Sequence, residues 1–248
     1  AKKYVIFREK RYLEMEFEGM ERVVDPFFKE EGCLSFEDLK GQKDYYLRVP
    51  GIVKEDLAGL CERILQLDGL KGVLTSNQGV MELLKGKTVL LGDYKLNLLN
   101  SYGLALYDEL EGALVSEEMG RKELEELKNK EAYLVYIYGP QEMMVLEHCL
   151  TKKGAGPCSC DSTPHYLQDQ KGYRLRLARD RYCRNHLYNG PVKNLLSDVN
   201  ALKEMGFGSF VIELFDEKDP QKILRAFKEE QGVDLPLSTR GHYHRGVE

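Results

Sequence analysis

The chain has 248 residues, of which 42% are hydrophobic and 31% charged, a balance that excludes a disordered or a fibrous protein. Its 36 lysines and arginines stand against 41 aspartates and glutamates, and the net charge of −5 argues against a chain coated with nucleic acid. No apolar run approaches the roughly 18 residues of a membrane span, and the first residues lack the apolar core of a secretory signal. We therefore expect a cytoplasmic protein without membrane contact.

The first part of the chain carries no pattern that predicts its packing. Residues 4–17 alternate loosely between apolar and polar side chains, as a hairpin does, and residues 18–43 are acidic and irregular. We treat residues 1–43 as a short lead-in segment that contains β-structure.

From residue 44 onward, strand and helix patterns alternate. Strands are expected at 45–49, 72–75, 88–91, 112–115, 132–138, 173–178 and 209–215, and helices at 53–67, 78–85, after Ser116, at 192–205 and from 220. This order predicts a mostly parallel sheet with helices outside. No glycine-rich phosphate loop follows the first strand, which disfavours an open doubly wound sheet. The sequence therefore predicts an α/β fold over residues 44–248, a TIM-like (β/α) barrel or partial barrel.

Polar residues follow several of the expected strands. Asp93 and Asn97 come after the strand at 88–91, and Ser116 comes after the strand at 112–115. Chemistry in such a barrel collects at the carboxyl ends of the strands, which makes Asp93 and Asn97 candidates for a pocket. The alternative is that these side chains only cap helices.

Four of the six cysteines lie close together in a cysteine-rich insertion that we place at residues 147–186. They are Cys149, Cys158, Cys160 and Cys183. Converging thiolates in a cytosolic protein suit zinc or an iron–sulfur cluster. The paired C-x2-C knuckles of structural zinc sites are absent, however, so free reduced thiols remain the alternative.

A basic segment, residues 171–193, overlaps this insertion and holds seven basic residues and one acid. Its arginines are Arg174, Arg176, Arg179, Arg181 and Arg184. Guanidinium groups bind phosphates, and the interleaved Tyr182 and Tyr188 offer rings for stacking on unpaired bases. This combination favours RNA over duplex DNA, whose readers usually present a helix. The alternative is that the arginines pair with acidic residues of the same protein.

No catalytic template fits the sequence, so the catalytic residues stay unknown at this level. The chain contains no H-E-x-x-H and no G-x-S-x-G motif. His242 and His244 near the end of the chain are able to reach a site, although tail residues are more often exposed or involved in packing.

Four separated segments resemble one known family. They are residues 92–101 (GDYKLNLLNS), 144–149 (MVLEHC), 180–189 (DRYCRNHLYN) and 239–247 (TRGHYHRGV). In this order they are similar to motifs of the collagenase-like "peptidase U-32" family, and the likeness runs from about Tyr45 to the end of the chain. The chain resembles the C-terminal barrel portion of the larger members.

The resemblance implies both a chemistry and a set of site residues. The family is catalogued as proteases, but several members hydroxylate bases of tRNA or rRNA, and relatives carry cysteine-bound iron–sulfur clusters. The resemblance thus implies Cys149, one or both of Cys158 and Cys160, and Cys183 as ligands. Glu147, His148 and His186 join the pocket candidates because they lie within the matching motifs.

One family feature is missing. The signature His-Gly-Ala-x-Cys followed by Ser-Gly-x-Cys does not occur in this sequence. We expect either that the chain is a fragment or that a partner subunit supplies that half.

Three functions follow as hypotheses. The first is a module for RNA base hydroxylation with a cysteine-bound metal or iron–sulfur site, positioned on RNA by the arginines. The second is a peptidase, with zinc as the metal to consider and Glu147 as the candidate general base. The third is a non-catalytic subunit that completes a larger barrel.

Overall fold

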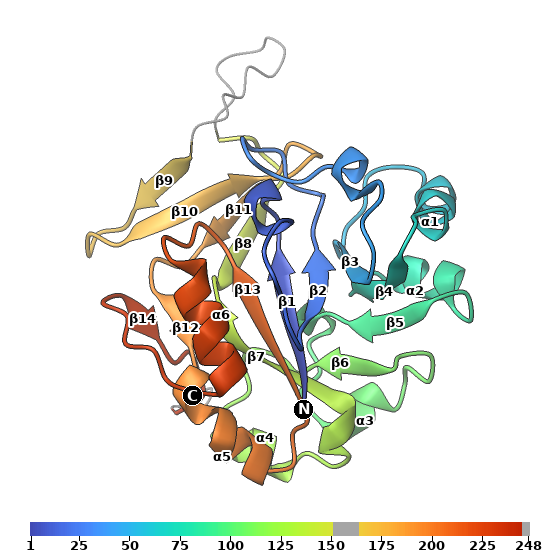
Figure 1. The fold of residues 1–248 in the computed structure, drawn as a ribbon. Helices are drawn as coiled ribbons and strands as arrows, with labels where there is room; N and C mark the ends of the chain where they lie inside the picture. The colour runs from blue at the N-terminus through green and yellow to red at the C-terminus, as the bar shows by residue number, and fades with distance from the viewer. Residues whose placement is uncertain (151–163, 245–248) are drawn as a thin grey trace.

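The computed structural model describes residues 1–150 and 164–244, in which eight parallel strands close into a barrel (Figure 1). The barrel strands are β1 (Lys2–Phe7), β2 (Glu21–Val24), β3 (Tyr45–Val49), β4 (Leu70–Thr75), β5 (Val89–Gly92), β6 (Gly112–Leu114), β7 (Tyr133–Gly139) and β13 (Ser209–Leu214). Closure comes from β13, which pairs in parallel with both β1 and β7. The predicted TIM-like α/β barrel is confirmed, and it is a closed one.

The lead-in segment is part of this barrel, so the division at residue 43 is wrong. β1 pairs with β13 in a parallel register that joins Lys2 to Ser209 and Phe7 to Leu214, and β2 pairs with β1 and β3. The hairpin expected at residues 4–17 does not form. Its strand residues are almost completely buried, as a central parallel strand requires, and the partner strand β13 lies some two hundred residues away.

The helices lie outside the barrel, and most follow the predicted pattern. They are α1 (Leu57–Leu65), α2 (Gln78–Leu84), α3 (Ser101–Leu104), α4 (Arg121–Glu126), α5 (Val199–Glu204) and α6 (Pro220–Glu229). Short 3-10 turns are η1 (Lys10–Tyr12), η2 (Phe36–Leu39), η3 (Tyr94–Leu96), η4 (Lys130–Ala132) and η5 (Leu196–Asp198). The start of α6 is confirmed, since Pro220 occupies its first turn and the Asp219 side chain accepts from Lys222 N at 3.1 Å.

Two helix starts differ from the prediction. The helix expected at 192–205 begins only at Val199, because β12 (Val192–Asn194) pairs with the end of β7 and with β14 (Ser238–Thr239). The helix expected after Ser116 begins at Arg121 with Gly120 as its N-cap residue.

A four-stranded antiparallel sheet is inserted between β7 and β12, and we call it the inserted sheet. It contains β8 (Glu142–Leu146), β9 (His165–Gln168), β10 (Arg174–Arg179) and β11 (Asn185–Tyr188) in the order β8-β11-β10-β9. In Figure 1 it lies above the carboxyl ends of β1, β2 and β13, and a bridge between Phe28 and Asp180 joins it to the loop after β2. The insertion is therefore real, and its paired strands begin before the expected residue 147 and end after residue 186.

The barrel interior is apolar over most of its height. Its buried side chains are Tyr4, Ile6, Val23, Tyr46, Leu74, Leu91, Leu114, Leu134, Tyr136 and Val211. A larger core packs between the sheet and the helices. In the described part of the chain, no helix combines the length and apolarity needed to cross a membrane.

Candidate active site at the carboxyl end of the barrel

The barrel interior changes from apolar to charged at the carboxyl ends of its strands. Two positions after an inward-facing apolar residue, the same face of the strand carries Arg8, Asp25, Arg48, Asp93 or Glu213. All five side chains are buried. Buried charges require partners, so this end of the barrel has to form an ion-pair network.

Two arginines organise the network. Arg48 Nε donates to Asp93 Oδ2 at 2.8 Å, and Arg48 Nη1 donates to Glu213 Oε2 at 3.1 Å. Arg8 binds the other oxygen of Glu213 and donates to the hydroxyl of Tyr188, on β11, at 2.9 Å. The network thus joins the barrel to the inserted sheet. Asp93 is the N-cap residue of η3, but its side chain makes no capping hydrogen bond and binds Arg48 instead.

Asp25 is the least neutralised member of this group. Its side chain accepts a hydrogen bond from the backbone N–H of Phe27 at 3.1 Å. Burial raises the pKa of Asp25, and the nearby charges of Arg48 and Arg8 offset only part of that effect.

The inserted sheet leaves little space over these charges. A cavity of about 30 Å³ remains, roughly the volume of one water molecule. His186 and Tyr188 from β11 line it together with Phe28, Arg48 and Asp93. The centre of the mouth is therefore closed to a substrate in this structure.

His186 is held between two carboxylates of the inserted sheet. Its Nδ1 lies 2.7 Å from Glu142 Oε2 and its Nε2 lies 3.1 Å from Asp180 Oδ2. Burial alone lowers the pKa of His186, but the hydrogen bonds to Asp180 and Glu142 outweigh burial and raise it above 6.5. Both ring nitrogens face carboxylate oxygens, which only accept hydrogen bonds, so this geometry favours the imidazolium form with both nitrogens donating.

An open cleft of about 460 Å³ lies beside the closed centre. Its lining residues are Tyr94, Lys95, Asn97, Ser116, Glu117, Glu118, Gln141, Glu142, Met143, Asn189 and His242. These come from the loops after β5 and β6, from the start of β8 and the adjacent end of β11, and from the segment after β14. The volume falls within the range of small-molecule sites, and the lining is rich in amide, hydroxyl and charged groups.

Asn97 and Ser116 belong to this cleft, as the pocket interpretation expects. Ser116 Oγ donates to Asn97 Oδ1 at 2.6 Å, which leaves the amide N–H donors of Asn97 for other partners. Asn97 has a φ of 53° and ends η3, so the Ser116 hydrogen bond fixes the side chain of a residue in a left-handed turn.

Glu147 and His148 do not reach either cavity. Both follow β8 and are exposed, and Glu147 pairs with Lys54. The general base expected for a peptidase therefore lies outside the described cavities.

The structure describes two of the four expected thiols. Cys149 is buried, whereas Cys183 is exposed and has a φ of 63°. The antiparallel pairing of Leu146 with Asn185 carries both cysteines to the same end of β8 and β11, and Asn185 Nδ2 donates to the backbone oxygen of His148 at 3.3 Å. Cys158 and Cys160 lie outside the described residues, and the described residues alone contain no group of three or more metal-binding side chains.

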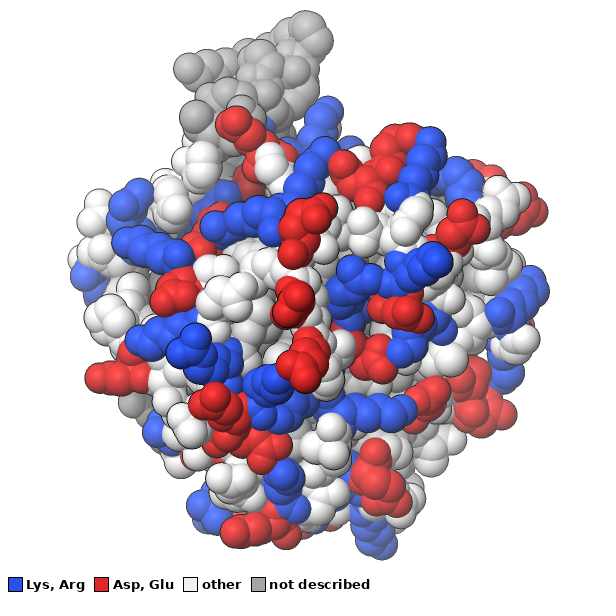
Figure 2. Space-filling model, in the orientation of Figure 1, with Lys and Arg blue, Asp and Glu red and all other residues white. Residues whose placement is uncertain are grey.

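The expectation of an RNA-binding arginine row is wrong for three of its five members. Arg176 pairs with Glu30 and with Asp216, Arg184 Nε donates to Asp180 Oδ2 at 2.7 Å, and Arg179 is only 3% exposed. Arg174 and Arg181 are exposed, Arg181 lying 3.4 Å from Glu55. On the face shown in Figure 2, basic and acidic side chains are interspersed, without one continuous basic patch. Arg176 and Arg184 pair with acidic residues because their side chains are buried beside the barrel mouth, whereas Arg179 Nε and Nη1 are buried without a hydrogen-bond partner among the described residues.

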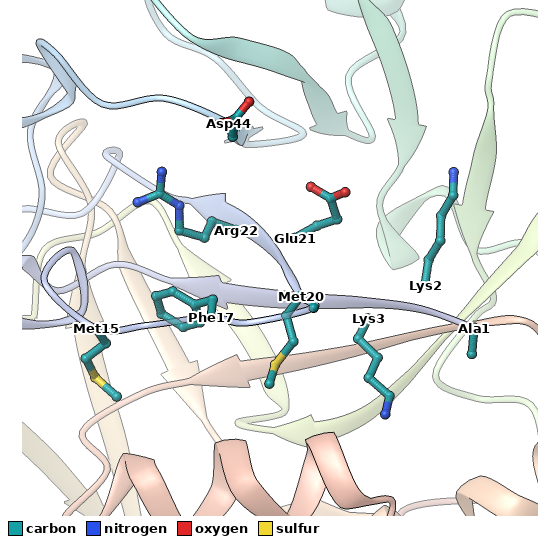
Figure 3. A pocket seen from close by; sticks show the side chains of 10 residues that line it. Ala1, Lys2, Lys3, Met15, Phe17, Met20, Glu21, Arg22 and Asp44 are labelled. Atoms are coloured by element: carbon teal, nitrogen blue, oxygen red, sulfur yellow. The ribbon is translucent and has the colours of Figure 1, made fainter.

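A second hollow of about 500 Å³ lies at the opposite end of the barrel, where β1 and β2 begin (Figure 3). Its lysines already pair with acidic residues, Lys2 with Glu111 at 2.7 Å and Lys3 with Glu230 at 3.1 Å. The amino-terminal face of a barrel serves stability, so we place the candidate site in the cleft at the other end.

Sequence reasoning placed Arg48 at the end of a strand but missed several other residues of the site, namely Arg8, Asp25, Lys95, Glu142, Asn189 and Glu213. For some of these residues, a pattern in the sequence could have identified them. A charged residue two positions after a buried apolar residue, at the carboxyl end of a strand, faces the mouth. Asn189 lies within the segment 180–189 that resembles a family motif, whereas for Glu142 no local pattern carries this information.

Comparisons with known proteins give no family and only distantly similar solved structures. No protein-family model and no curated protein matches the chain. A chitinase from Rhizomucor miehei is similar over 93% of this chain and 100% of its own, with 11% identity and a TM-score of 0.49. A glycoside hydrolase family 18 N-acetylglucosaminidase from Paenibacillus barengoltzii (8% identity, TM-score 0.46, 93% and 100% covered) and a GH18 chitinase from Cycas revoluta (10%, 0.45, 93% and 99%) are comparable. We transfer no substrate or reaction from these enzymes.

Proposed function

We propose that this chain is an enzyme domain of the peptidase U-32 kind and that it takes part in hydroxylation of an RNA base bound in the open cleft. One observation carries the proposal. The segments that resemble that family are distant in sequence, yet they meet at this cleft.

Residues from three of those segments line the cleft directly. Lys95 and Asn97 come from the first, Asn189 from the third and His242 from the last. The second segment begins at Met144, directly after the lining residue Met143. A resemblance due to packing alone gives no reason for these segments to share one polar surface.

The chemistry of the cleft suits a single nucleobase. Its volume of about 460 Å³ accepts a base with its sugar, and Tyr94 contributes to its lining. The side chains of Asn97, Gln141 and Asn189 supply the donors and acceptors that read a base edge. A base that enters this cleft has to leave the stack of its RNA, as enzymes acting on bases generally require.

The cofactor belongs to the same proposal. We infer that Cys149 and Cys183, at one end of the inserted sheet, supply thiolates to an iron–sulfur cluster, with Cys158 and Cys160 as the remaining ligands. Such a cluster supplies one-electron transfer when bound. The two described thiols do not complete a ligand set, so we derive no reaction step through it.

The other hypotheses lose support from the structure. The chain closes its own eight-stranded barrel, so a subunit that completes a larger barrel is the wrong description. A peptidase loses its expected general base, because Glu147 pairs with Lys54 away from the described cavities. A further domain or partner subunit with the missing family signature remains part of the proposal.

The test compares the modified nucleosides of cellular RNA with and without the gene. Total RNA from a strain that lacks the gene is digested and analysed by mass spectrometry, and the strain is complemented with the wild type or with Asn97→Ala. We expect a hydroxylated nucleoside to disappear, to return with the wild type and to stay absent with the variant. Identical nucleoside profiles in all strains contradict the proposal.

A further inference from the structure

The strongest unassigned feature is a chain of charged side chains that leads from the inserted sheet to the cleft. Arg184 binds Asp180, Asp180 binds His186, His186 binds Glu142, and Glu142 binds Lys95. The side chains of Asp180, His186 and Glu142 are 3%, 7% and 8% exposed, whereas that of Lys95 is 35% exposed. The row of ion pairs is therefore buried except at Lys95, which lines the cleft and is accessible from it.

Within this row of charged side chains, the positive charge of Lys95 is not balanced by a negative charge of its own. The carboxylate of Asp180 is balanced by Arg184, and that of Glu142 is balanced by the His186 imidazolium. The ammonium of Lys95 shares Glu142 but is left with a net positive charge, and two of its three N–H donors have no partner among the described residues. A fixed cation with free donors at a cleft wall binds oxyanions.

The acidic residues of the cleft do not cancel this charge. Glu117 pairs with Lys193 at 2.9 Å, and both side chains are largely buried. Glu118 is exposed, where water and salt screen it. Lys95 is thus the available cation of the described cleft wall.

We propose that Lys95 binds a phosphate of the RNA next to the base in the cleft, and that the His186 imidazolium is the positioning residue that leaves Lys95 its charge. This inference rests on the proposed function, since it names how that cleft holds its substrate. It also makes binding of the phosphate depend on pH. When His186 loses its proton, Glu142 neutralises Lys95 instead.

The other groups around His186 leave Glu142 and Asp180 in control of its protonation. Glu142 from β8 and Asp180 from the turn before β11 contact its nitrogens, and the ring of Phe28 from the loop after β2 lies 5.0 Å away. Across the small cavity its neighbours are Asp25, Arg48, Asp93, Tyr94, Lys95, Tyr188 and Glu213. In that second group Arg48 is bound to Asp93 and Glu213, so the two carboxylates in direct contact with His186 govern its proton.

The experiment measures binding of dinucleoside monophosphates and of the corresponding nucleosides by calorimetry. A phosphodiester keeps one negative charge at every pH used, whereas a nucleoside carries none. At about pH 6, where His186 is charged, we expect the wild type to bind the dinucleotide about tenfold more tightly than the nucleoside. Lys95→Gln abolishes this preference. Lys40→Gln removes an exposed lysine that also pairs with a glutamate, and keeps the preference.

Substitutions of His186 and of Glu142 are expected to change the preference for the dinucleotide in opposite directions. His186→Gln lowers the preference at about pH 6 to the value that the wild type shows at about pH 9. Glu142→Gln leaves Lys95 charged throughout, so the preference persists at the higher pH. Thermal unfolding of each variant shows that it is folded under the conditions of the measurement.

The outcomes separate this inference from the function on which it rests. If the wild type binds neither nucleosides nor dinucleotides, the proposed function fails and this inference fails with it. If nucleosides bind but the phosphodiester adds no affinity, or if Lys95→Gln retains the preference, the inference alone is overturned.

Discussion

Arg48 and Glu213 face one another across the barrel mouth, with Arg48 Nη1 donating to Glu213 Oε2 at 3.1 Å although 165 residues separate them in sequence. The same guanidinium binds Asp93, so one side chain contacts two buried carboxylates. This contact ties β3, β5 and β13 together at the floor of the candidate site.

Arg48→Met is therefore expected to destabilise the protein strongly. It leaves Asp93 buried without its cation and leaves Glu213 with Arg8 alone; the loss of one partner of a buried ion pair typically costs about 3–5 kcal/mol. Urea denaturation measures the change in the free energy of unfolding. Arg63→Met is the matched control, because Arg63 also pairs with a glutamate but is half exposed, and its loss should cost less than about 1 kcal/mol. Equal effects of the two variants would show that the mouth network is not stabilising.

The stability of the protein should fall at both ends of the pH range, for two different reasons. Burial opposes the charge of Glu142, but its bonds to His186 and Lys95 lower its pKa to about 2, so its contribution is present above about pH 4.5 and is lost as the pH falls toward 2. His186 has a raised pKa, so its contribution is present below about pH 6.5 and is lost as the pH rises through the folded value.

Denaturation curves across the pH range check these signs. His186→Gln should lose less stability than the wild type between neutral and alkaline pH. A wild type whose stability does not change between about pH 6 and pH 9 contradicts the imidazolium assignment.

Gly139, at the end of β7, should not tolerate a side chain. Its φ is 141°, and an added Cβ would lie 2.1 Å from the hydroxyl of Tyr136 and 2.9 Å from the backbone oxygen of Glu213. Gly139→Ala should therefore cost more than about 2 kcal/mol and displace Tyr136 from the mouth. Gly86 also has a positive φ but open space around it, so Gly86→Ala should cost only about 1 kcal/mol. Thermal melts of the two variants give the comparison.

Iron analysis of cysteine variants distinguishes a metal site from free thiols. Protein purified without oxygen should contain iron and acid-labile sulfide, and Cys149→Ser and Cys183→Ser should each reduce both. Cys61 packs on the buried face of α1, so Cys61→Ser is a control that keeps the iron. Wild-type protein without iron after anoxic handling rules out the proposed iron–sulfur cluster, whether or not zinc is present.

The exposed and the buried arginines of β10 should behave differently. The guanidinium of Arg174 lies 4.2 Å from the ring of Tyr166, and both side chains are exposed, whereas Arg176 is bound to Glu30. Arg174→Gln should weaken retention on RNA without changing the melting temperature. Arg176→Gln should lower the melting temperature, since it leaves Glu30 partly buried and unpaired. The reverse pattern contradicts the assignment of Arg176 to the ion-pair network.

The sequence by itself determined the elements whose signals are local. The periodicity of residues 57–65, the cap at Asp219 with Pro220, and the apolar runs of β3, β7 and β13 all depend on neighbours within a few residues, and all were predictable. Their alternation was enough to indicate the α/β barrel. The polar residues at strand ends similarly pointed to Asp93 and Asn97.

Only the tertiary structure decided which charged groups meet. The parallel pairing of β1 with β13, which makes residues 1–43 part of the barrel, joins positions that no local pattern connects. Arg176 and Arg184 were expected on an RNA-binding surface, but the inserted sheet buries them in ion pairs. A buried charge without an opposite charge beside it is strongly destabilising. The linkage of Lys95, Glu142 and His186 likewise exists only once the inserted sheet lies over the barrel mouth.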